Sequence, residues 1–250
     1  MNYDALEQRY WGDQQRRVSS LVQKIQARPS LSNGRVVPED ADLSIGDGRR
    51  LSMAVMFIDI CGFSSRPMET LTDQENTLRC LNLYFTEMIR IAEDYGGNVE
   101  KNTGDGLLIY FNDGEGNPAE AGSKRAVSCA LTMLATTKHV INPVLEISGI
   151  KSIEFRTSID YGNVTVAKIG APRRFNANVA IGATANFASK ALRFAGAGEI
   201  VIGEAARNQL PQYWQANWTE LIALPSGWIH VNDQSPYWLY RYIGRWVNLL

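Results

Sequence analysis

The sequence predicts an α+β fold in which a mostly antiparallel sheet is flanked by helices. Strand-like and helix-like segments alternate along the middle of the chain, and two of them carry clear patterns. The run AVMFIDI at 54–60 is apolar except for one aspartate, which is typical of a strand buried on both faces. In the segment 72–95, apolar residues recur at spacings of three and four, which predicts a helix with one buried face.

The other elements of the main domain follow in chain order. The first strand is expected to end near Gly62, and Gly96 and Gly97 are expected to end the helix. A tight hairpin turn at Gly104–Asp105 joins two strand-like runs, because glycine adopts the positive φ that such a turn requires. Beyond this hairpin the pattern predicts a helix at 119–139, a strand pair at 153–170, a helix at 182–198 and a last strand at 237–244.

The chain is expected to divide into three parts. Residues 1–50 are predicted to form a helical arm and a linker rich in proline, glycine and serine. Residues 51–205 form the main domain, and residues 206–250 form a tryptophan-rich extension that packs on it. The tryptophans of this extension favour either of two interpretations, a stacking surface for bases or the filling of a core; they are Trp214, Trp218, Trp228, Trp238 and Trp246.

Composition and charge exclude several classes of function. The chain has 250 residues, of which 45% are hydrophobic and 20% charged, enough to bury a full core. A net charge of -1 without a long basic run argues against binding nucleic acid or an anionic membrane. No apolar run reaches the roughly 18 residues of a membrane-spanning helix. Three dispersed cysteines and two histidines disfavour disulfides and thiolate zinc sites, so a cytoplasmic protein is expected.

Two aspartates carry the first functional signal. Asp59 lies at the end of the first core strand and Asp105 at the tip of the hairpin, so the two could hold two divalent cations, Mg²⁺ or Mn²⁺. For either residue alone the structural interpretation is favoured, because aspartate often caps a helix and Gly-Asp is a common turn. Their combination with the motifs around them favours a ligand role.

Three motifs in this order resemble the class III nucleotide cyclases. The segment FIDICGF at 57–63 matches the family pattern F-x-D-I-x-G-F, and KNTGD at 101–105 matches K-x-x-G-D. The segment GATANFASK at 182–190 matches G-x-x-x-N-x-A-S-R, with lysine where arginine is usual. The resemblance covers roughly residues 50–205 and implies a ferredoxin-like core.

The resemblance also implies a reaction and a homodimer with composite sites. A nucleoside triphosphate's 3′ hydroxyl would attack its own α-phosphate, releasing pyrophosphate and a 3′,5′-cyclic monophosphate. One subunit would hold two Mg²⁺ or Mn²⁺ ions through Asp59, Asp105 and the backbone carbonyl of Ile60. The other would supply Asn186 to orient the ribose and Lys190 to neutralise the α-phosphate. Lysine lacks the planar fork of arginine, and a solvated helix lysine is the alternative for this position.

Further substrate contacts are implied with departures from the family pattern. Phe63 closes the first motif and is expected in the substrate site, and Lys101 would face the base. The position that binds an adenine amine in adenine-specific members falls on Val179, or on Asn178 if the loop shifts by one residue. The family's C-terminal phosphate-binding lysine has no counterpart. Arg174 and the arginine before it could replace that lysine, although such a pair is more often a solvated surface feature.

The base position favours UTP, with CTP second and ATP as the main competitor. Lys101 donates hydrogen bonds only, so it suits uracil oxygens as well as adenine N1. Asn178 carries both a donor and an acceptor and could pair with uracil, whereas an adenine amine would lose its acceptor. The compact layout also resembles the Pycsar cyclases of bacterial antiphage defence, which make cyclic UMP or cyclic CMP that a separate effector protein reads.

Three alternatives stay open. An adenylate cyclase making cyclic AMP shares every motif except the base contacts. A catalytically dead cyclase-like module would bind nucleotide or a partner protein, but Asp59, Asp105 and Asn186 are intact. A palm-type polymerase or diguanylate cyclase shares the two-aspartate sheet but should carry a GG-[DE]-[DE]-F hairpin. The hairpin of this chain has TGDGLL at 103–108 instead.

Overall fold

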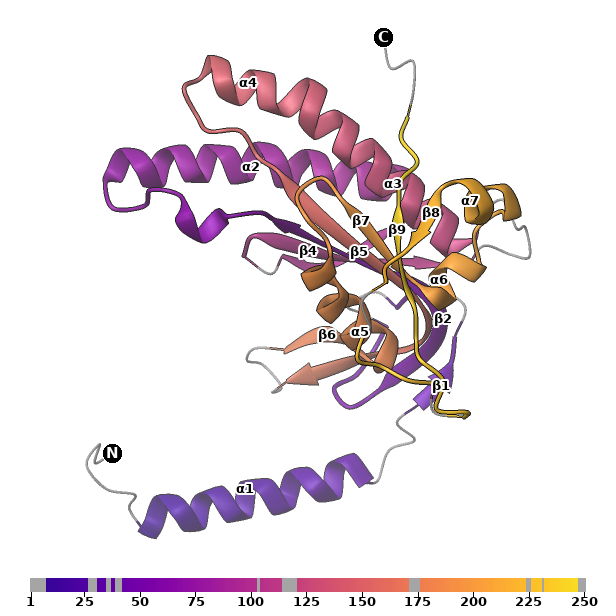
Figure 1. Ribbon diagram of the computed structural model, residues 1–250. Coiled ribbons are helices and arrows are strands. Elements are labelled where there is room, and N and C mark those ends of the chain that lie inside the picture. Colours follow the sequence, from indigo (N-terminus) through magenta and orange to yellow (C-terminus); the bar gives the residue numbers. More distant parts are fainter. Residues whose placement is uncertain are drawn as a thin grey trace.

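A computed structural model describes most of the chain, and one twisted sheet organises it (Figure 1). The described residues are 8–26, 31–34, 37–38, 42–102, 104–113, 121–170, 176–223, 226–230 and 232–246. Within these ranges nine strands form the sheet in the order β3-β4-β2-β5-β7-β9-β8, with β1 beside β2 and β6 beside β5. The strands are β1 (Leu31–Asn33), β2 (Gly48–Ile60), β3 (Asn98–Asn102), β4 (Gly106–Asn112), β5 (Phe155–Gly170), β6 (Asn176–Ile181), β7 (Ile200–Gly203), β8 (Thr219–Leu221) and β9 (Leu239–Tyr242).

The predicted fold class is confirmed. Of the strand pairs in the described sheet, only β1–β2 and β5–β7 are parallel, so the sheet is mostly antiparallel. The elements β2-α2-β3-β4-α3-β5, with the strand order β3-β4-β2-β5, form a ferredoxin-like core. The helices are α1 (Gln8–Gln26), α2 (Leu71–Asp94), α3 (Gly122–Thr136), α4 (Asn142–Ile147), α5 (Ala183–Ala191), α6 (Glu204–Asn208) and α7 (Gln212–Asn217).

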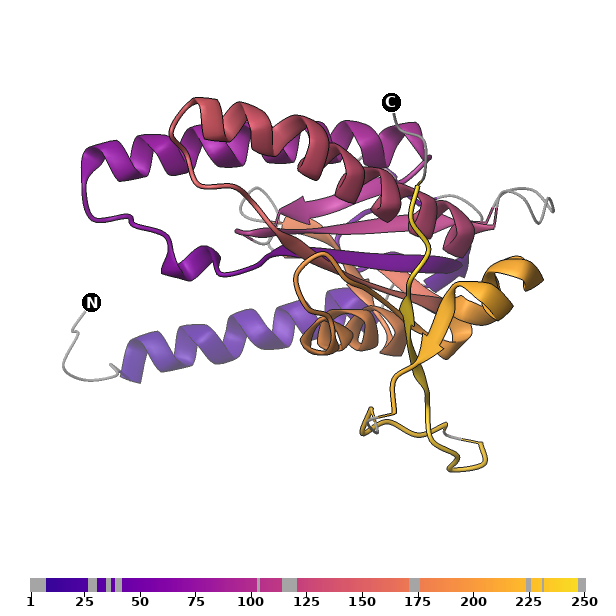
Figure 2. The same cartoon turned by 45° about the horizontal axis from the view of Figure 1, so that its top comes forward.

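Strand β2 is buried on both faces, as its apolar run predicts. Alternate side chains point to opposite faces of a strand, and here Met56 packs toward the helices α2 and α3 while Val55 packs toward α5. Figure 2 shows the resulting layers, with α2 and α3 on one face of the sheet and α5 on the other. The end of β2 is therefore held on both sides, which fixes the position of Asp59.

Helix α2 follows the predicted bounds closely. Its N-terminus is fixed by a capping box in which Thr70 and Asp73 exchange hydrogen bonds, and its C-terminus meets Gly96 in a left-handed conformation at φ 68°. The predicted apolar stripe is wrong at Leu78, whose side chain is 60% exposed. The rest of the predicted stripe is confirmed at Phe85, Met88 and Ala92, and the buried face also includes Cys80 and Tyr84.

The predicted strand pair at 153–170 is wrong, because this segment forms the single long strand β5. Strand β5 pairs with β2 along the whole length of β2, from Gly48 opposite Ala167 to Ile60 opposite Phe155. Gly162 lies within this strand, where α5 packs closely against it. A Cβ at this position would lie 2.5 Å from the hydroxyl of Thr184 in α5.

The helix predicted at 119–139 continues further than expected. After α3 the chain makes a π-helical turn at Thr137–Ile141 and then enters α4, which ends at Ile147. Pro143 directly follows the π-helical turn and does not stop the helix.

Near the two ends of the chain the structure has a helical arm and two strands of the sheet. Helix α1 forms the predicted N-terminal arm at one end of the molecule (Figure 1). Strands β8 and β9 extend the sheet. Trp214 and Trp218 pack against the main core and Trp228 against a smaller cluster, as the core-filling interpretation predicts. The division at residues 50 and 205 stays a prediction.

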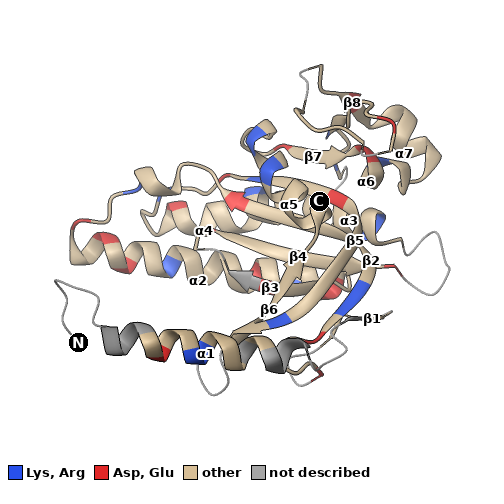
Figure 3. Cartoon of the chain, turned by 90° about the horizontal axis from the view of Figure 1, so that it is seen from below, with Lys and Arg blue, Asp and Glu red and all other residues tan. Residues whose placement is uncertain are grey.

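The described surface is mixed in charge. Figure 3 shows acidic and basic residues interspersed over the helices and strands drawn there. None of the helices in the described ranges is both long and apolar enough to span a membrane.

Candidate active site

The ends of β2 and β4 bring the two predicted aspartates together. Asp59 lies opposite Gly106 in the antiparallel β2–β4 pair, and Asp105 directly precedes this glycine. The backbone N–H of Ile60 donates to the carbonyl of Asp105 at 2.9 Å. Gly104 has φ 99°, which allows the tight turn that holds Asp105 at this edge. Both aspartates are partly exposed, so ions could reach them.

Arg156 is a site residue that the sequence did not reveal. It lies opposite Asp59 in the β2–β5 pair, and its Nε and Nη2 atoms donate to the same oxygen of Asp59 at 2.9 and 2.8 Å. Finding Arg156 would have required the β2–β5 register, which the wrongly predicted strand pair concealed. The arginine adds fixed positive charge beside the carboxylates, where it could bind phosphate.

The oxygen atoms at this edge are suitable ligands for a hard divalent cation. Two carboxylates and neighbouring backbone carbonyls offer oxygen ligands, which Mg²⁺ and Mn²⁺ prefer. Burial raises the pKa of the nearby Cys61 thiol, so it stays protonated and adds no thiolate ligand. In the described ranges no cluster of three or more histidine, cysteine and acidic side chains exists. A metal site here would consequently depend on this aspartate pair and on ligands from the substrate.

Helix α5 presents the two residues predicted to act on the ribose and the α-phosphate. Asn186 and Lys190 are both exposed and lie four residues apart, so they share one face of the helix. The hydroxyl of Ser158 in β5 donates to the carbonyl of Ala188 at 2.6 Å, which ties the opposite face to the sheet. At Gly182, which precedes the helix, a Cβ would lie 3.0 Å from the carbonyl oxygen of Asn163.

The strands that carry the predicted base contacts are linked. Lys101 lies in β3 and Asn178 in β6, and the carboxylate of Glu100 accepts a hydrogen bond from the backbone N–H of Ala180 at 3.1 Å. Glu100 is thus a second residue that sequence reasoning missed. The side chain of Lys101 lies outside the described part of the structure.

Asn178 keeps unused hydrogen-bonding capacity. Its Nδ2 atom donates to the carbonyl of Pro38 over a long 3.4 Å, and its Oδ1 atom is buried without a partner among the described residues. Val179, the alternative base position, pairs with Ala167, and its side chain points to the other face of β6. Only one of the two can face a given pocket.

Two other predicted residues have different outcomes. Phe63 lies in the short 3₁₀ helix after β2, partly buried against the main core beside the aspartate pair. Arg174 lies outside the described residues, as does the arginine before it.

Within one chain the site consists of separate parts. Across the described residues, no hydrogen bond or ion pair joins Asp59 or Asp105 to Asn186 or Lys190.

A family model described as the adenylate and guanylate cyclase catalytic domain matches residues 48–237, which include both aspartates and α5. The chain belongs to this cyclase family.

Solved cyclase structures share the fold. The guanylyl cyclase Cya2 superposes with a TM-score of 0.66 at 22% identity, over 81% of this chain and 96% of that one. The adenylyl cyclase CyaB from P. aeruginosa gives 0.64 at 27% identity, over 82% and 100%. A class III adenylyl cyclase-like ATP-binding protein from Pseudomonas aeruginosa gives 0.67 at 20% identity, over 80% and 44%. No curated protein matches this chain in sequence.

Membership of the cyclase family gives the separate parts a common chemistry. The aspartate pair and Arg156 form an oxygen-rich, charge-compensated edge that can hold cations and phosphate. Helix α5 adds a polar amide and an ammonium group on one exposed face. The family model spans both sets of residues.

Proposed function

We propose that this cyclase domain converts UTP to 3′,5′-cyclic UMP and pyrophosphate. The observation that carries the cyclase chemistry is the aspartate pair, Asp59 and Asp105, on adjoining ends of β2 and β4 beside Arg156. In the reaction the 3′ oxygen of the ribose bonds to the α-phosphorus, the bond to the leaving pyrophosphate breaks, and the hydroxyl proton passes to solvent. No covalent enzyme intermediate is needed.

We assign Asp59, Asp105 and the carbonyl of Ile60 to the binding of two divalent cations, Mg²⁺ or Mn²⁺. Bound cations would neutralise phosphate charge and favour ionisation of the 3′ hydroxyl. The guanidinium of Arg156, already oriented by two hydrogen bonds to Asp59, would supply further positive charge to the triphosphate. Phe63 would line the substrate site next to the two aspartates. Arg174 would contact the terminal phosphates of the substrate.

We assign α5 of a second copy to the same nucleotide. Asn186 would orient the ribose, and Lys190 would neutralise charge on the α-phosphate. Both side chains are exposed, and no described contact engages them with the aspartate pair of their own chain. This supports a homodimer in which each site takes its cations from one subunit and α5 from the other.

The preference for UTP rests on the base contacts. Lys101 would donate to a uracil oxygen, and Asn178 would offer one donor and one acceptor to the O4 and N3–H edge. The amide of Asn178 supports this assignment, because its Nδ2 atom makes only a long contact of 3.4 Å to the Pro38 carbonyl, which a base could replace. An adenine amine would find no carboxylate or threonine at this position.

ATP is the second candidate substrate. The solved relative with 27% identity is an adenylyl cyclase, which favours cyclic AMP as the product. A third possibility is a domain that binds nucleotide without turnover, and a solved neighbour described as an adenylyl cyclase-like ATP-binding protein has a similar fold. The three proposals differ in product, so one assay separates them.

The cellular role we propose rests on the resemblance of this sequence to the Pycsar cyclases. The product would then be a second messenger of bacterial antiphage defence. A separate effector protein in the cytoplasm would read it.

Product analysis tests these proposals directly. The purified protein is incubated separately with ATP, GTP, CTP and UTP plus Mn²⁺, and the products are resolved by mass spectrometry. We expect cyclic UMP to form fastest. Faster formation of cyclic AMP would overturn the pyrimidine preference but keep the cyclase activity, and no cyclic product with any of the four would overturn both.

A further inference from the structure

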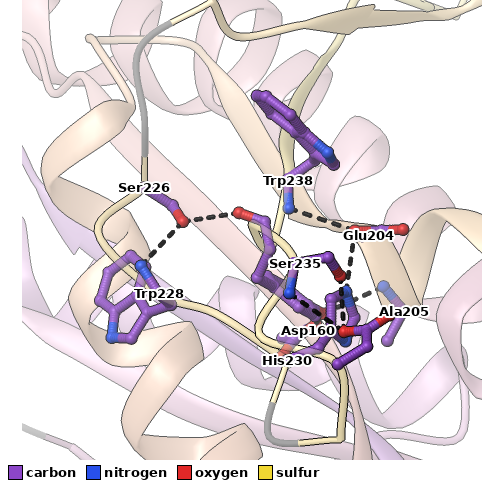
Figure 4. Close-up of polar contacts among 10 residues, drawn as sticks. Asp160, Glu204, Ala205, Ser226, Trp228, His230, Ser235 and Trp238 are labelled. Carbon is purple, nitrogen blue, oxygen red and sulfur yellow. Dashed lines mark hydrogen bonds and ion pairs between the residues drawn. The ribbon is translucent and has the colours of Figure 1, made fainter.

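A C-terminal strap packs against α5. The strap is the segment 226–238, of which the structure describes 226–230 and 232–238. It folds back on itself, because the N–H of Tyr237 donates to the carbonyl of Trp228 at 2.9 Å and the N–H of His230 to that of Ser235 at 2.8 Å. Ser226 closes the loop by accepting from the Trp228 N–H and donating to the Tyr237 carbonyl (Figure 4).

Two aromatic side chains of the strap hold one residue of α5. The ring of Phe187 lies 4.4 Å from that of Trp228 and 4.5 Å from that of Tyr237, centroid to centroid. Arg193, in the 3₁₀ turn after α5, places its guanidinium 5.1 Å from the Trp228 ring and donates to the carbonyl of Ser226 at 3.1 Å. The strap therefore contacts α5 at its middle and beyond its C-terminal end.

The strap is itself anchored to the sheet by buried polar contacts. The hydroxyl of Tyr237 donates to Oδ1 of Asp160 at 2.6 Å and accepts from the N–H of Ala205 at 3.0 Å. Asp160 lies in β5 and is only 4% exposed. Gly203 makes room for this contact, since a Cβ there would lie 2.2 Å from Asp160 Oδ1.

Glu204 forms a second anchor beside the first. Its Oε2 atom accepts from the N–H of Trp238 at 3.2 Å and lies 3.3 Å from Nε2 of His230. Figure 4 shows Glu204, His230 and Trp238 grouped next to Asp160. Because these contacts join β5, the start of α6 and both arms of the strap, the strap has a defined position on the sheet.

Helix α5 is oriented by contacts on two sides, with Ala185 and Ala188 packed on the sheet and Phe187 packed on the strap. It has nine residues, and Gly182 at its N-cap provides no side-chain hydrogen bond. Short helices are stabilised mainly by the packing of their buried face. Phe187 is the largest side chain on that face and is next in sequence to Asn186, so a shift of the Phe187 ring moves the exposed face as well.

We propose that Trp228 and Tyr237 are positioning residues, which clamp Phe187 and so hold Asn186 and Lys190 at the composite site. The proposal rests on the proposed cyclase function for its effect on turnover. Its structural part, that the strap fixes α5, stands on the contacts alone. Misplacement of reacting groups by about 1 Å can lower turnover roughly a hundredfold.

Hydrogen–deuterium exchange tests the structural part without any assay of activity. We compare the wild type with Trp228→Ala, and with Tyr237→Phe, which keeps the ring and loses only the hydroxyl. Trp246→Ala serves as a matched control, because Trp246 lies outside the strap and its indole N–H donates a hydrogen bond to Thr132 of α3. We expect the α5 amides to exchange about tenfold faster in Trp228→Ala and less so in Tyr237→Phe. Amides of α2 should not change in any variant.

Mixed dimers test the link to the composite site. A strap variant damages α5 but keeps Asp59, so co-expression with Asp59→Ala should restore one intact site. Co-expression with Asn186→Ala should restore nothing, because both chains then lack a working α5. Homodimers of Trp228→Ala should show kcat lowered roughly ten- to hundredfold with KM changed less than about twofold, and Trp228→Phe should recover most of the loss.

The outcomes separate this proposal from the proposed function. Equal rescue by both partners, or activity that only follows the folded fraction, would mean that the strap merely stabilises the protein. Unchanged exchange in α5 of Trp228→Ala and Tyr237→Phe would overturn the positioning role. If Trp228→Ala does not fold, the same comparison is made with Tyr237→Phe alone. If the wild type forms no cyclic nucleotide, the proposed function fails, and the exchange data still decide whether the strap positions α5.

Discussion

Asp59 and Arg156 face each other across β2 and β5, and two guanidinium nitrogens donate to the same oxygen of the carboxylate, at 2.9 and 2.8 Å. The pair fixes the direction of both side chains at the edge where Asp105 also lies. Their side chains are 22% and 35% exposed, so the ion pair itself is worth at most about 1 kcal/mol of stability. The pair is thus better suited to organising a binding site than to stabilising the fold.

The aspartates should be essential for turnover and of little importance for stability. Asp59→Ala or Asp105→Ala removes a proposed cation ligand while leaving the core unchanged, so product formation should be lost. Thermal melting should remain cooperative, with a free energy of unfolding within about 1 kcal/mol of the wild type. Near-wild-type turnover of either variant with Mg²⁺ or Mn²⁺ would show that the cations bind elsewhere.

Arg156 should contribute to turnover through its charge and its planar shape. Arg156→Ala should lower kcat roughly a hundredfold or more, and Arg156→Lys should lose less, because lysine keeps the charge but not the fork. Arg241→Ala is the matched control, since Arg241 pairs with Glu199 at 2.9 Å in another part of the sheet. If both alanine variants reduce kcat equally, Arg156 has no special role in binding phosphate.

The sequence predicted the elements that depend on local patterns and missed the contacts that depend on register. The β2 strand and α2 followed from apolar spacing and glycine stops, and the pairing of Asp59 with Asp105 followed from the resemblance of their motifs to the cyclase family. Arg156 was missed because the segment 153–170 was predicted to be a strand pair, whereas it is one strand paired with β2.

The strap could not be predicted for a related reason. Its anchor joins Tyr237 to Asp160, residues 77 positions apart, and its clamp joins Trp228 to Phe187. Neither segment has a sequence pattern that predicts which residues it contacts, because aromatic residues near a chain end occur in cores and in binding surfaces alike. Only the order of strands β5, β7 and β9 brings these residues together.

A homodimer with composite sites should show complementation between inactive variants. Asp59→Ala lacks a cation ligand and Asn186→Ala lacks the ribose contact, so neither homodimer should be active. Mixed dimers contain one undamaged site and should recover a measurable part of the activity. Light scattering that detects only an active monomer would contradict the shared site and return Asn186 to the role of a surface helix residue.

Asn178 should control the choice of base. Asn178→Asp replaces an amide, which donates and accepts hydrogen bonds, with a carboxylate, which only accepts them. The uracil O4 would lose its donor, whereas a base with an exocyclic amine would gain an acceptor. The ratio of kcat/KM for UTP to that for ATP should fall by roughly ten- to hundredfold. Val179→Asp is the control, since Val179 points to the opposite face of β6. A larger shift in Val179→Asp would mean that Val179, not Asn178, faces the base.

Asp160 should make the stability of the protein depend on pH. Burial raises the pKa of Asp160 to about 7, although hydrogen bonds from Tyr237 and from the Tyr161 N–H oppose this. In the unfolded chain the pKa is about 3.9, so between these values the folded protein holds a proton that the unfolded chain releases. The free energy of unfolding contributed by this group therefore falls as the pH rises from about 4 to about 7 and changes little above it.

Replacing Asp160 with asparagine should make the free energy of unfolding depend less on pH, whether or not it changes the stability at any one pH. Urea unfolding between about pH 5 and about pH 8 should show a steeper loss of stability in the wild type than in Asp160→Asn, because a tenfold change in proton affinity corresponds to about 1.4 kcal/mol. The groups facing Asp160 and its anchor are Tyr237, Glu204 and the imidazole of His230, which pairs with Glu204. They remain in both proteins, and His230→Gln removes the imidazole as a further control. Equal slopes in the wild type and Asp160→Asn would mean that Asp160 is already ionised in the folded protein over this whole range. The Tyr237 contact would then be a charge-assisted hydrogen bond whose contribution does not change between about pH 5 and about pH 8.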